Sequence, residues 1–208
     1  MTAPPPGAFY TALPFVLASA SPRRQEALRL LGLEFEIVRP TGVEPQALAD
    51  ENPADYALRA AQAKAFAAAR ARPDAFVLGA DTVVALAGEI LGKPHDKRHA
   101  LDMLQRLAGK SHVVFSACCC RLPDGTARYA TGEARVHFFP WPRDVLAAYA
   151  ATDEVLDKAG AYAIQGQGAF LAHEIEGSAS AVVGLPMTQL VSLLSELGVI
   201  RACAAPWG

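Results

Sequence analysis

The stretch FVLASASPRR, residues 15–24, decides the fold, because an apolar run passes through a short polar loop directly into a helix start. The run from Phe15 to Ala18 predicts a buried strand. Ser21 is suited to the N-cap of a helix and Pro22 to its first turn, and Gly32 is placed to end that helix. The order of strand, polar loop and helix is typical of α/β domains.

Two arginines occupy the first turn of this predicted helix, where the helix dipole favours negative charge. Arg23 and Arg24 therefore indicate a bound anion, which the free backbone N–H groups and the hydroxyls of Ser19 and Ser21 would also contact. Forked guanidinium groups suit phosphate oxygens in particular. The alternative is an ordinary solvated helix start that carries a pair of basic residues.

A lysine and an aspartate further along the chain are placed to join such a site. Lys64 lies among alanines at helical spacing, in a helix that Asn52 caps and Pro53 begins, so its side chain is expected on an inward face. The alternative is a lysine that extends along the edge of that face to solvent. Asp81 follows the apolar run 76–80, which predicts a buried strand with an acid at its tip, the usual position for active-site residues.

The remaining pattern predicts strands and helices without an internal repeat. A tight hairpin over residues 83–91 should return Glu89 and Lys93 toward Asp81. The other expected elements are a strand at 35–38, a hairpin of 112–122 with 126–139, helices from Asp96, at 143–150 and from Pro186, and a glycine-rich segment at 157–168 that lines a cleft.

Four segments in order along the chain carry a family resemblance. They are the serine–arginine loop, GADTVV at 79–84 with GEILGKP at 88–94, DKAGAYAIQG at 157–166, and VGLP at 183–186. Together they resemble the Maf family of nucleoside triphosphate pyrophosphatases, and the match extends from about Leu17 to Leu197. The variants ADT and AYAIQ resemble the branch that acts on dTTP and UTP rather than the branch that acts on 7-methyl-GTP. Many members have two adjacent acids after the second strand, whereas Glu44 is followed here by Pro45.

The resemblance implies a single α/β domain with a central mixed twisted sheet flanked by helices, bilobed around a nucleotide cleft as in Maf and ITPase proteins. We expect this domain to span residues 13–200, after a disordered leader, residues 1–12, and before a C-terminal tail, residues 201–208. The implied reaction yields a nucleoside monophosphate and pyrophosphate, and a homodimer is a further expectation. One alternative is a purine pyrophosphatase acting on ITP or XTP. The other is a non-enzymatic nucleotide-binding regulator, because the family name is linked to septum inhibition and cell-division arrest.

A triphosphate needs cations for its oxygens, a metal or equivalent charge at the bond to be broken, and a base that orients water. Asp81, Lys93 and Glu44 are the expected catalytic residues, and Asp81 is the expected general base, the role that the resemblance also assigns to it. Glu44 and Asp81 are the expected ligands of a divalent cation, Mg²⁺ first and Mn²⁺ or Co²⁺ as alternatives. The expected phosphate ligands share a positive charge: Arg23, Arg24, Lys64 and Lys93.

Base recognition is assigned to Gln165. Its amide presents a donor and an acceptor in one plane, as does the O4 and N3–H edge of uracil or thymine. Thr82 is expected to shape the same pocket. The alternative for Gln165 is an amide that only caps a loop.

Composition limits the partners and the compartment. The 208-residue chain carries 19 Lys and Arg against 21 Asp and Glu, which argues against binding nucleic acid through bulk positive charge. Cys118, Cys119 and Cys120 lack the spacing of a zinc site and indicate small strand residues in a reducing compartment. No stretch approaches the roughly twenty apolar residues of a membrane span. We therefore expect a cytoplasmic protein whose partner is a small nucleotide, and neither nucleic acid nor membrane.

Overall fold

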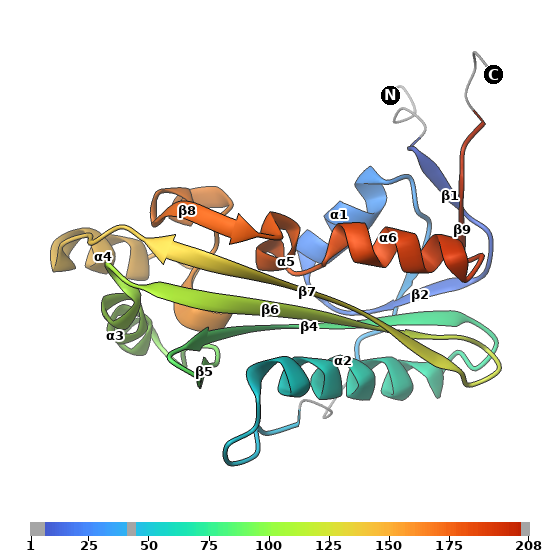
Figure 1. Ribbon diagram of the computed structural model, residues 1–208, viewed down its shortest axis with the longest axis horizontal. Coiled ribbons are helices and arrows are strands. Elements are labelled where there is room, and N and C mark those ends of the chain that lie inside the picture. Colours follow the sequence, from blue (N-terminus) through green and yellow to red (C-terminus); the bar gives the residue numbers. More distant parts are fainter. Residues whose placement is uncertain (1–6, 41–44, 205–208) are drawn as a thin grey trace.

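The computed structural model describes residues 7–40 and 45–204 of the chain (Figure 1). Its strands are β1 (Phe9–Thr11), β2 (Phe15–Ala18), β3 (Glu36–Ile37), β4 (Phe76–Leu86), β5 (Glu89–Leu91), β6 (Ser111–Arg121), β7 (Ala127–Phe138), β8 (Ala172–Gly177) and β9 (Ile200–Ala202). Its helices are α1 (Pro22–Leu30), α2 (Pro53–Ala69), α3 (Lys97–Leu107), α4 (Arg143–Ala150), α5 (Ala179–Val183) and α6 (Met187–Glu196), with the 3₁₀ turns η1 (Ala159–Ala161) and η2 (Gly166–Phe170). None of the described helices is long and apolar enough to cross a membrane.

A long mixed sheet runs through the molecule in the strand order β3-β2-β4-β6-β7-β8, with β5 also paired to β4. β2 runs parallel to β3 and β4. β4, β6, β7 and β8 are successively antiparallel. A hairpin joins β6 to β7, whereas β5 and α3 lie between β4 and β6, and α4 with η1 and η2 lies between β7 and β8. The expected α/β fold with a central mixed sheet is therefore confirmed.

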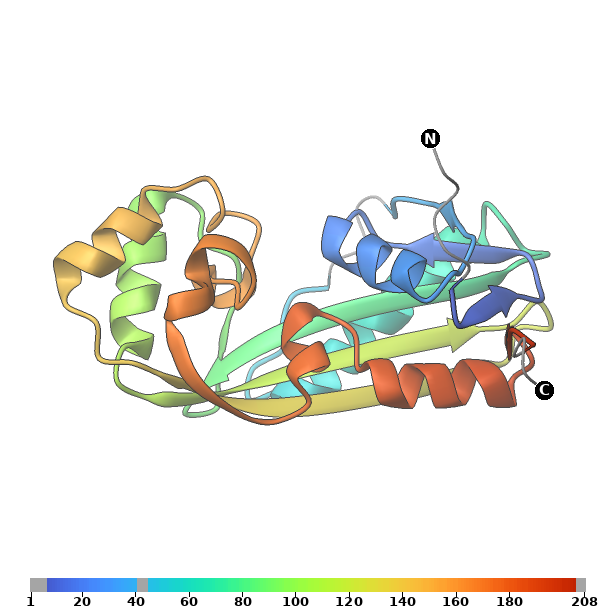
Figure 2. The same ribbon diagram turned by 90° about the horizontal axis from the view of Figure 1, so that it is seen from above.

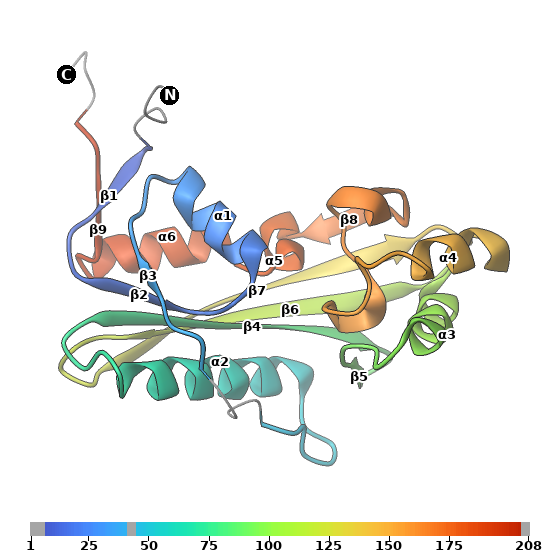
Figure 3. The ribbon, with the colours of Figure 1, turned by 180° about the vertical axis from the view of Figure 1, so that it is seen from behind.

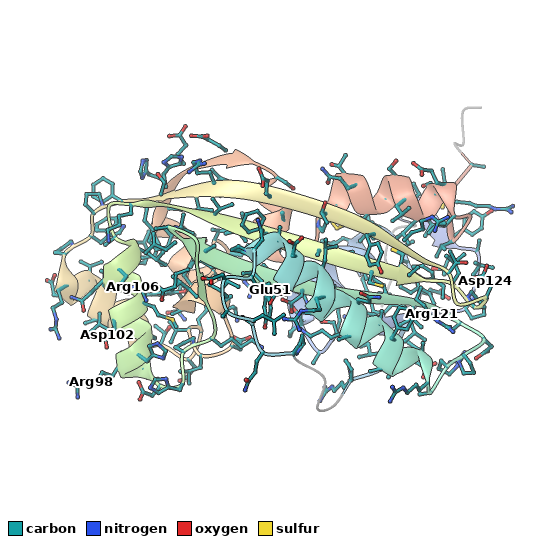
Figure 4. All side chains as sticks on the ribbon, turned by 60° about the horizontal axis from the view of Figure 1, so that its bottom comes forward. Glu51, Arg98, Asp102, Arg106, Arg121 and Asp124 are labelled. Atoms are coloured by element: carbon teal, nitrogen blue, oxygen red, sulfur yellow. The ribbon has the colours of Figure 1, made fainter. Side chains whose placement is uncertain are left out.

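Helices cover the sheet in three separate apolar clusters. α2 packs its alanines against one face of the sheet, and Figure 4 shows the molecule with this helix in front. α1 and α6 cover the opposite face over β2 and β4. α3 and α4 pack with the far ends of β4, β6 and β7, so that two groups of helices lie apart along the sheet (Figure 2). This separation gives the molecule its two lobes.

The expected capping residues and glycine lie at the ends of the helices. Asn52 Oδ1 accepts a hydrogen bond from the backbone N–H of Ala54 at 2.9 Å at the start of α2, and Asp96 accepts one at 2.7 Å at the start of α3. Ser21 occupies the N-cap of α1, although its hydroxyl makes no capping bond. Gly32 follows α1 with a φ of 90°, a conformation that glycine adopts without strain.

An ion pair fixes the chain that leads into α2. Arg59 on α2 binds Glu51 in a bidentate pair through one edge of its guanidinium, with Nε 2.8 Å from Oε1 and Nη2 2.6 Å from Oε2. Arg59 also donates to Gln46 O at 2.8 Å. The hydrogen bond from Arg59 holds the pKa of the Glu51 carboxyl below its ordinary value. Glu51 is labelled in Figure 4 near the start of the helix.

The structure corrects the expected leader, residues 1–12, and the expected tail, residues 201–208. β1 pairs antiparallel with β9. The N–H of Phe9 in β1 donates to Leu31 O at 3.0 Å, and its ring packs against the cluster under α1 and α6. Both strands belong to the folded domain, since each satisfies backbone groups of the other. The outer parts of both predictions lie outside the described residues.

β4 corrects the position predicted for Asp81. The apolar run 76–80 is only the first half of an 11-residue strand, so Asp81 lies in the middle of β4 and not at its tip. The hairpin onto β5 forms as predicted. It does not carry Glu89 toward Asp81, because the Glu89 carboxylate lies 2.5 Å from the guanidinium of Arg106 on α3.

The three consecutive cysteines are free, buried thiols in β6. Cys118 and Cys120 face the cluster under α1 and α6, whereas Cys119 faces the cluster under α2. Burial raises the pKa of Cys118 and of Cys119 to about 12, so both thiols stay protonated and unreactive. Their interpretation as small strand residues is confirmed.

A histidine is buried in the cluster of α3 and α4. His112 is 1% exposed, and its Nε2 lies 2.6 Å from the hydroxyl of Tyr162. Its Nδ1 has no hydrogen-bond partner among the described residues. Burial lowers the pKa of His112 to about 4, with a smaller contribution from His137. His112 is therefore neutral in the folded protein at neutral pH.

Acid should destabilise the protein through His112. Between about pH 6.5 and pH 4 the unfolded chain binds a proton there and the folded chain does not, so stability is lost as the pH falls. From about pH 8 to about pH 5 this group should remove about 2 kcal/mol from the free energy of unfolding. His112→Gln, which stays neutral, should lose correspondingly less than the wild type. Denaturant unfolding at both pH values measures this difference, and equal losses would contradict the assignment.

Candidate active site

A gap in the pairing of β4 creates the site. On one edge of β4, pairing with β2 ends at Gly79 and pairing with β5 begins at Val84. Residues 80–83 have no described strand neighbour on that edge, while β6 pairs the other edge. A cavity of about 470 Å³ opens here. Because successive strand residues alternate, Asp81 and Thr82 line it from opposite faces of the sheet.

The cavity lies between α1 and the segment that carries η1 and η2, which Figure 3 shows on the same side of the sheet. Its charged lining consists of five basic side chains and two carboxylates: Arg23, Arg24, Lys64, Lys93, Lys158, Asp81 and Asp157. Its larger apolar lining residues include Val84, Ile90, Leu91, Val114, Ile164, Val182 and Val183. Excess positive charge beside an apolar wall suits a ligand with an anionic part and an uncharged part.

A buried ion pair lies in the cavity wall. Lys64 Nζ on α2 is 2.5 Å from Asp81 Oδ1 on β4, with 17% and 10% of the two side chains exposed. Close packing brings them together, because a Cβ on Gly79 would lie 2.3 Å from Ala61 O and 2.6 Å from Ala65 N. Only glycine lets α2 approach β4 so closely. The interpretation of Lys64 as an inward-facing residue is confirmed.

Arg24 binds the protein itself. Its Nε donates to Gly184 O at 3.0 Å, its Nη1 to Ala80 O at 2.9 Å, and its Nη2 to Thr82 Oγ1 at 2.9 Å. Nη1 also lies 3.3 Å from Ser19 Oγ. Ala80 lies in the gap of β4, so the guanidinium satisfies a carbonyl that a neighbouring strand would otherwise bind. The geometry makes Arg24 a bridge between α1, β4 and the turn before α6.

Arg23 lines the cavity from the same turn of α1. Burial lowers the pKa of Arg23, while the charges of Asp157 and Glu154 on the facing segment act in the opposite direction. An arginine stays charged despite such a shift. Arg23 is thus the helix-start cation that faces across the cavity.

The facing wall carries two lysines. Lys93 follows β5, and the residue before it is tied to η1 by a hydrogen bond from Gly160 N to Gly92 O at 3.0 Å. Lys158 pairs with the carboxylate of Asp157, and 12% of its side chain is exposed. Both residues lie in the segment 157–166, and neither was predicted from the sequence to have a role in the site. The signal that could have found them was a charged pair inside a glycine-rich segment.

A model described as Maf-like protein matches residues 14–197. The chain belongs to this family. It is 48% identical to the dTTP/UTP pyrophosphatase of Nitratidesulfovibrio vulgaris, over 96% of this chain and 95% of the relative. It is 43% identical to the dTTP/UTP pyrophosphatase of Escherichia coli, over 89% of this chain and 93% of the relative. Among solved structures, a HAM1 protein from Coxiella burnetii is similar with a TM-score of 0.49 and 16% identity, over 89% of this chain and 98% of that chain.

The other site residues predicted for this Maf-like protein have separate positions. Ser19 is buried, and its Oγ accepts a hydrogen bond from Ser21 N at 3.2 Å, while Ser21 lines the cavity. Gln165 is exposed between η1 and η2 and does not line the cavity. Glu44 lies outside the described residues, so its role stays a prediction.

The two neighbouring arginines of this Maf-like protein should respond differently to mutation. Arg24→Ala removes the guanidinium donors to Ala80 O and Gly184 O and leaves Gly184 O with the longer contact from Thr82 Oγ1 at 3.4 Å, so the free energy of unfolding should fall by about 2 kcal/mol. Arg24→Lys should restore little, because one ammonium cannot reach these separated acceptors. Arg23→Ala should change stability by less than about 0.5 kcal/mol. Denaturant unfolding of the three variants measures these differences, and equal losses for both alanine variants would contradict the division of roles.

Proposed function

We propose that this protein is a nucleoside triphosphate pyrophosphatase that hydrolyses dTTP and UTP to the monophosphate and pyrophosphate. The observation that carries the proposal is the buried pair of Lys64 and Asp81 in a cavity with an excess of positive charge. The relatives named dTTP/UTP pyrophosphatase, which match nearly the whole chain, support the choice of reaction and base.

In this mechanism Arg23, Lys93 and Lys158 hold the phosphate oxygens from the two sides of the cavity. Asp81 accepts a proton from the attacking water, whose oxygen bonds to the α-phosphorus. The bond from the α-phosphorus to the oxygen that bridges to the β-phosphorus breaks, and pyrophosphate leaves with that electron pair. Lys64 holds the carboxylate in one orientation and offsets negative charge on the phosphates.

Mg²⁺ is part of the proposal. Among the described residues, no group of three or more His, Cys, Asp or Glu side chains could hold a metal ion. Asp81 supplies one carboxylate beside the cations that bind phosphate, and Asp157 is paired with Lys158. These donors fit Mg²⁺ held jointly by a carboxylate, substrate oxygens and water, with Glu44 as a second proposed ligand. The bound ion would polarise the phosphoryl oxygens.

Base selection is proposed to involve two residues. Thr82 Oγ1 accepts from Arg24 and lies 2.8 Å from Ser116 Oγ, so its hydroxyl is fixed beside the apolar part of the cavity. Gln165 lies on the loop that continues from the cavity-lining Ala163 and Ile164. Because Gln165 is exposed, its contact with the base requires its side chain to turn inward when the nucleotide binds, while the backbone of the loop stays in place.

The homodimer that the family resemblance implies is also part of this proposal, as is the cytoplasmic location expected from the cysteines. The buried free thiols of β6 are consistent with a reducing compartment. Light scattering of the purified protein would measure the mass in solution against that of a 21.9 kDa chain.

Asp81→Asn should abolish turnover and leave the affinity for nucleotide within about tenfold, because the amide keeps the shape of the side chain but cannot accept the proton. Steady-state kinetics and equilibrium binding measure the two effects. Asp102→Asn on the exposed face of α3 (Figure 4) is a matched control. Near-normal turnover by Asp81→Asn would remove this residue from the mechanism.

Pyrophosphate release from a panel of nucleotides with Mg²⁺ tests the substrate. We expect dTTP and UTP to exceed CTP by roughly ten- to a hundredfold in kcat/KM, since cytosine reverses the donor and acceptor pattern of the base edge. GTP should be a poor substrate. ITP or XTP as the fastest substrate would support the purine alternative instead, and binding without any turnover would support a regulator.

A further inference from the structure

Two residues outside the cavity lining hold the segment that forms its far wall. Tyr149 lies in the last turn of α4, and Glu154 lies in the turn that follows. The segment they contact, residues 163–168, follows directly on the cavity-lining Tyr162 and includes the exposed Gln165. Neither residue is among those predicted from the sequence.

One hydrogen bond joins these two residues, and two more connect them to both ends of the segment. The hydroxyl of Tyr149 donates to Glu154 Oε2 at 2.9 Å and accepts from Ala163 N at 3.2 Å. Glu154 Oε2 also accepts from Gly168 N at 3.1 Å. The loop between Ala163 and Gly168 is therefore closed onto one hydroxyl and one carboxylate oxygen.

Two glycines let the backbone of the loop lie directly against Tyr149 and Glu154, because a side chain at either position would collide with its neighbours. A Cβ on Gly166 would lie 2.2 Å from Glu154 Oε1. A Cβ on Gly168 would lie 2.4 Å from Ala163 O and 2.6 Å from Tyr149 Oη. The backbone is thus wrapped around the two side chains, and their position determines where the loop lies.

The chemical state of Tyr149 suits this role. It is 3% exposed, and its burial, followed by its hydrogen bond to Glu154, raises its pKa well above the ordinary value of a tyrosine. The hydroxyl therefore keeps its proton and can donate and accept at the same time.

The preceding turn needs such support. Ala161 is buried and has a φ of 62°, a left-handed conformation that costs a residue with a Cβ of order 1 kcal/mol or more. Contacts on both sides oppose this strain: Gly160 N donates to Gly92 O at 3.0 Å, and Ala163 is held by Tyr149. Loss of the contact to Ala163 leaves the turn free to relax away from the cavity.

We propose that Tyr149 and Glu154 are positioning residues that hold the far wall in the conformation that binds the nucleotide. The inference rests on the proposed function, because it assigns the pair to the base-binding side of the same cavity. Ala163 and Ile164 line the cavity directly before Gln165, the proposed contact to the base, so the pair should act on binding and base choice and not on the attack of water.

The test compares three variants with UTP and CTP as substrates. Tyr149→Phe removes both hydrogen bonds of the hydroxyl, and Glu154→Ala removes the acceptor for both donors. Each should raise KM for UTP about tenfold, leave kcat within about threefold, and reduce the preference for UTP over CTP. Glu154→Gln keeps a carbonyl oxygen that can accept both hydrogen bonds, so it should restore most of the lost affinity.

Hydrogen exchange of residues 157–170 without nucleotide supplies a readout that needs no turnover. Exchange should be faster in Tyr149→Phe and Glu154→Ala than in the wild type and in Glu154→Gln. Tyr129→Phe, at an exposed tyrosine of β7, and Asp153→Asn, at a side chain that is 98% exposed, are the matched controls.

Distinct outcomes overturn the two proposals. A wild-type protein without activity on UTP refutes the proposed function. Hydrogen exchange would then still test whether Tyr149 and Glu154 hold the loop in place. Unchanged exchange in both Tyr149→Phe and Glu154→Ala refutes that hold. Faster exchange with wild-type KM and base preference, or a fall in kcat alone, refutes the positioning role. Glu154→Gln as impaired as Glu154→Ala also refutes it, because the charge of Glu154 opposite Arg23 would then be the important property.

Discussion

The close approach of α2 to β4 is the constraint on which the site depends. Gly79 and the alanines at 61 and 65 remove the side-chain volume that usually separates a helix from a sheet. α2 then lies near enough to β4 for Lys64 to reach Asp81, the next strand residue after Gly79 that faces the helix. A larger residue at 79 would displace the helix and separate the ion pair, so the packing of the core and the chemistry of the cavity share one steric requirement.

The gap in strand pairing along β4 is the second feature that shapes the site. A strand interior normally has partners on both edges, yet residues 80–83 of β4 are paired on one edge only. This brings residues from both faces of the sheet, Asp81 and Thr82, to one cavity. Arg24 supplies one hydrogen bond to the backbone of β4 at the gap, to Ala80 O, and it also binds the hydroxyl of Thr82. The site is therefore an interruption of the sheet that an arginine stabilises.

Capping residues and helix-ending glycines predicted the ends of the helices correctly, because they act on their immediate neighbours in the sequence. The caps at Asn52 and Asp96 and the end of α1 before Gly32 depend on neighbouring residues, so the sequence determines them. Asp81 was placed at a strand tip because a charge after an apolar run resembles an end. Its true position depends on strand partners distant in the chain. The same limit applies to the hydrogen bond from Arg24 to Gly184, because Gly184 lies far along the chain. It also applies to the hydrogen bonds of Tyr149 and Glu154, whose partners lie in an irregular loop.

The bond from Arg24 to Gly184 has a consequence for how the protein is made. These residues are 160 positions apart, so the bridge cannot form until nearly the whole chain has been synthesised. At roughly 5–20 residues per second, α1 waits on the order of ten seconds or longer for its partner. During that interval the edge of β4 at the gap has neither a strand nor the turn before α6 to complete it. Assembly of the cavity is therefore a late event of biosynthesis, and a chain released early would carry the arginine without the structure that orients it.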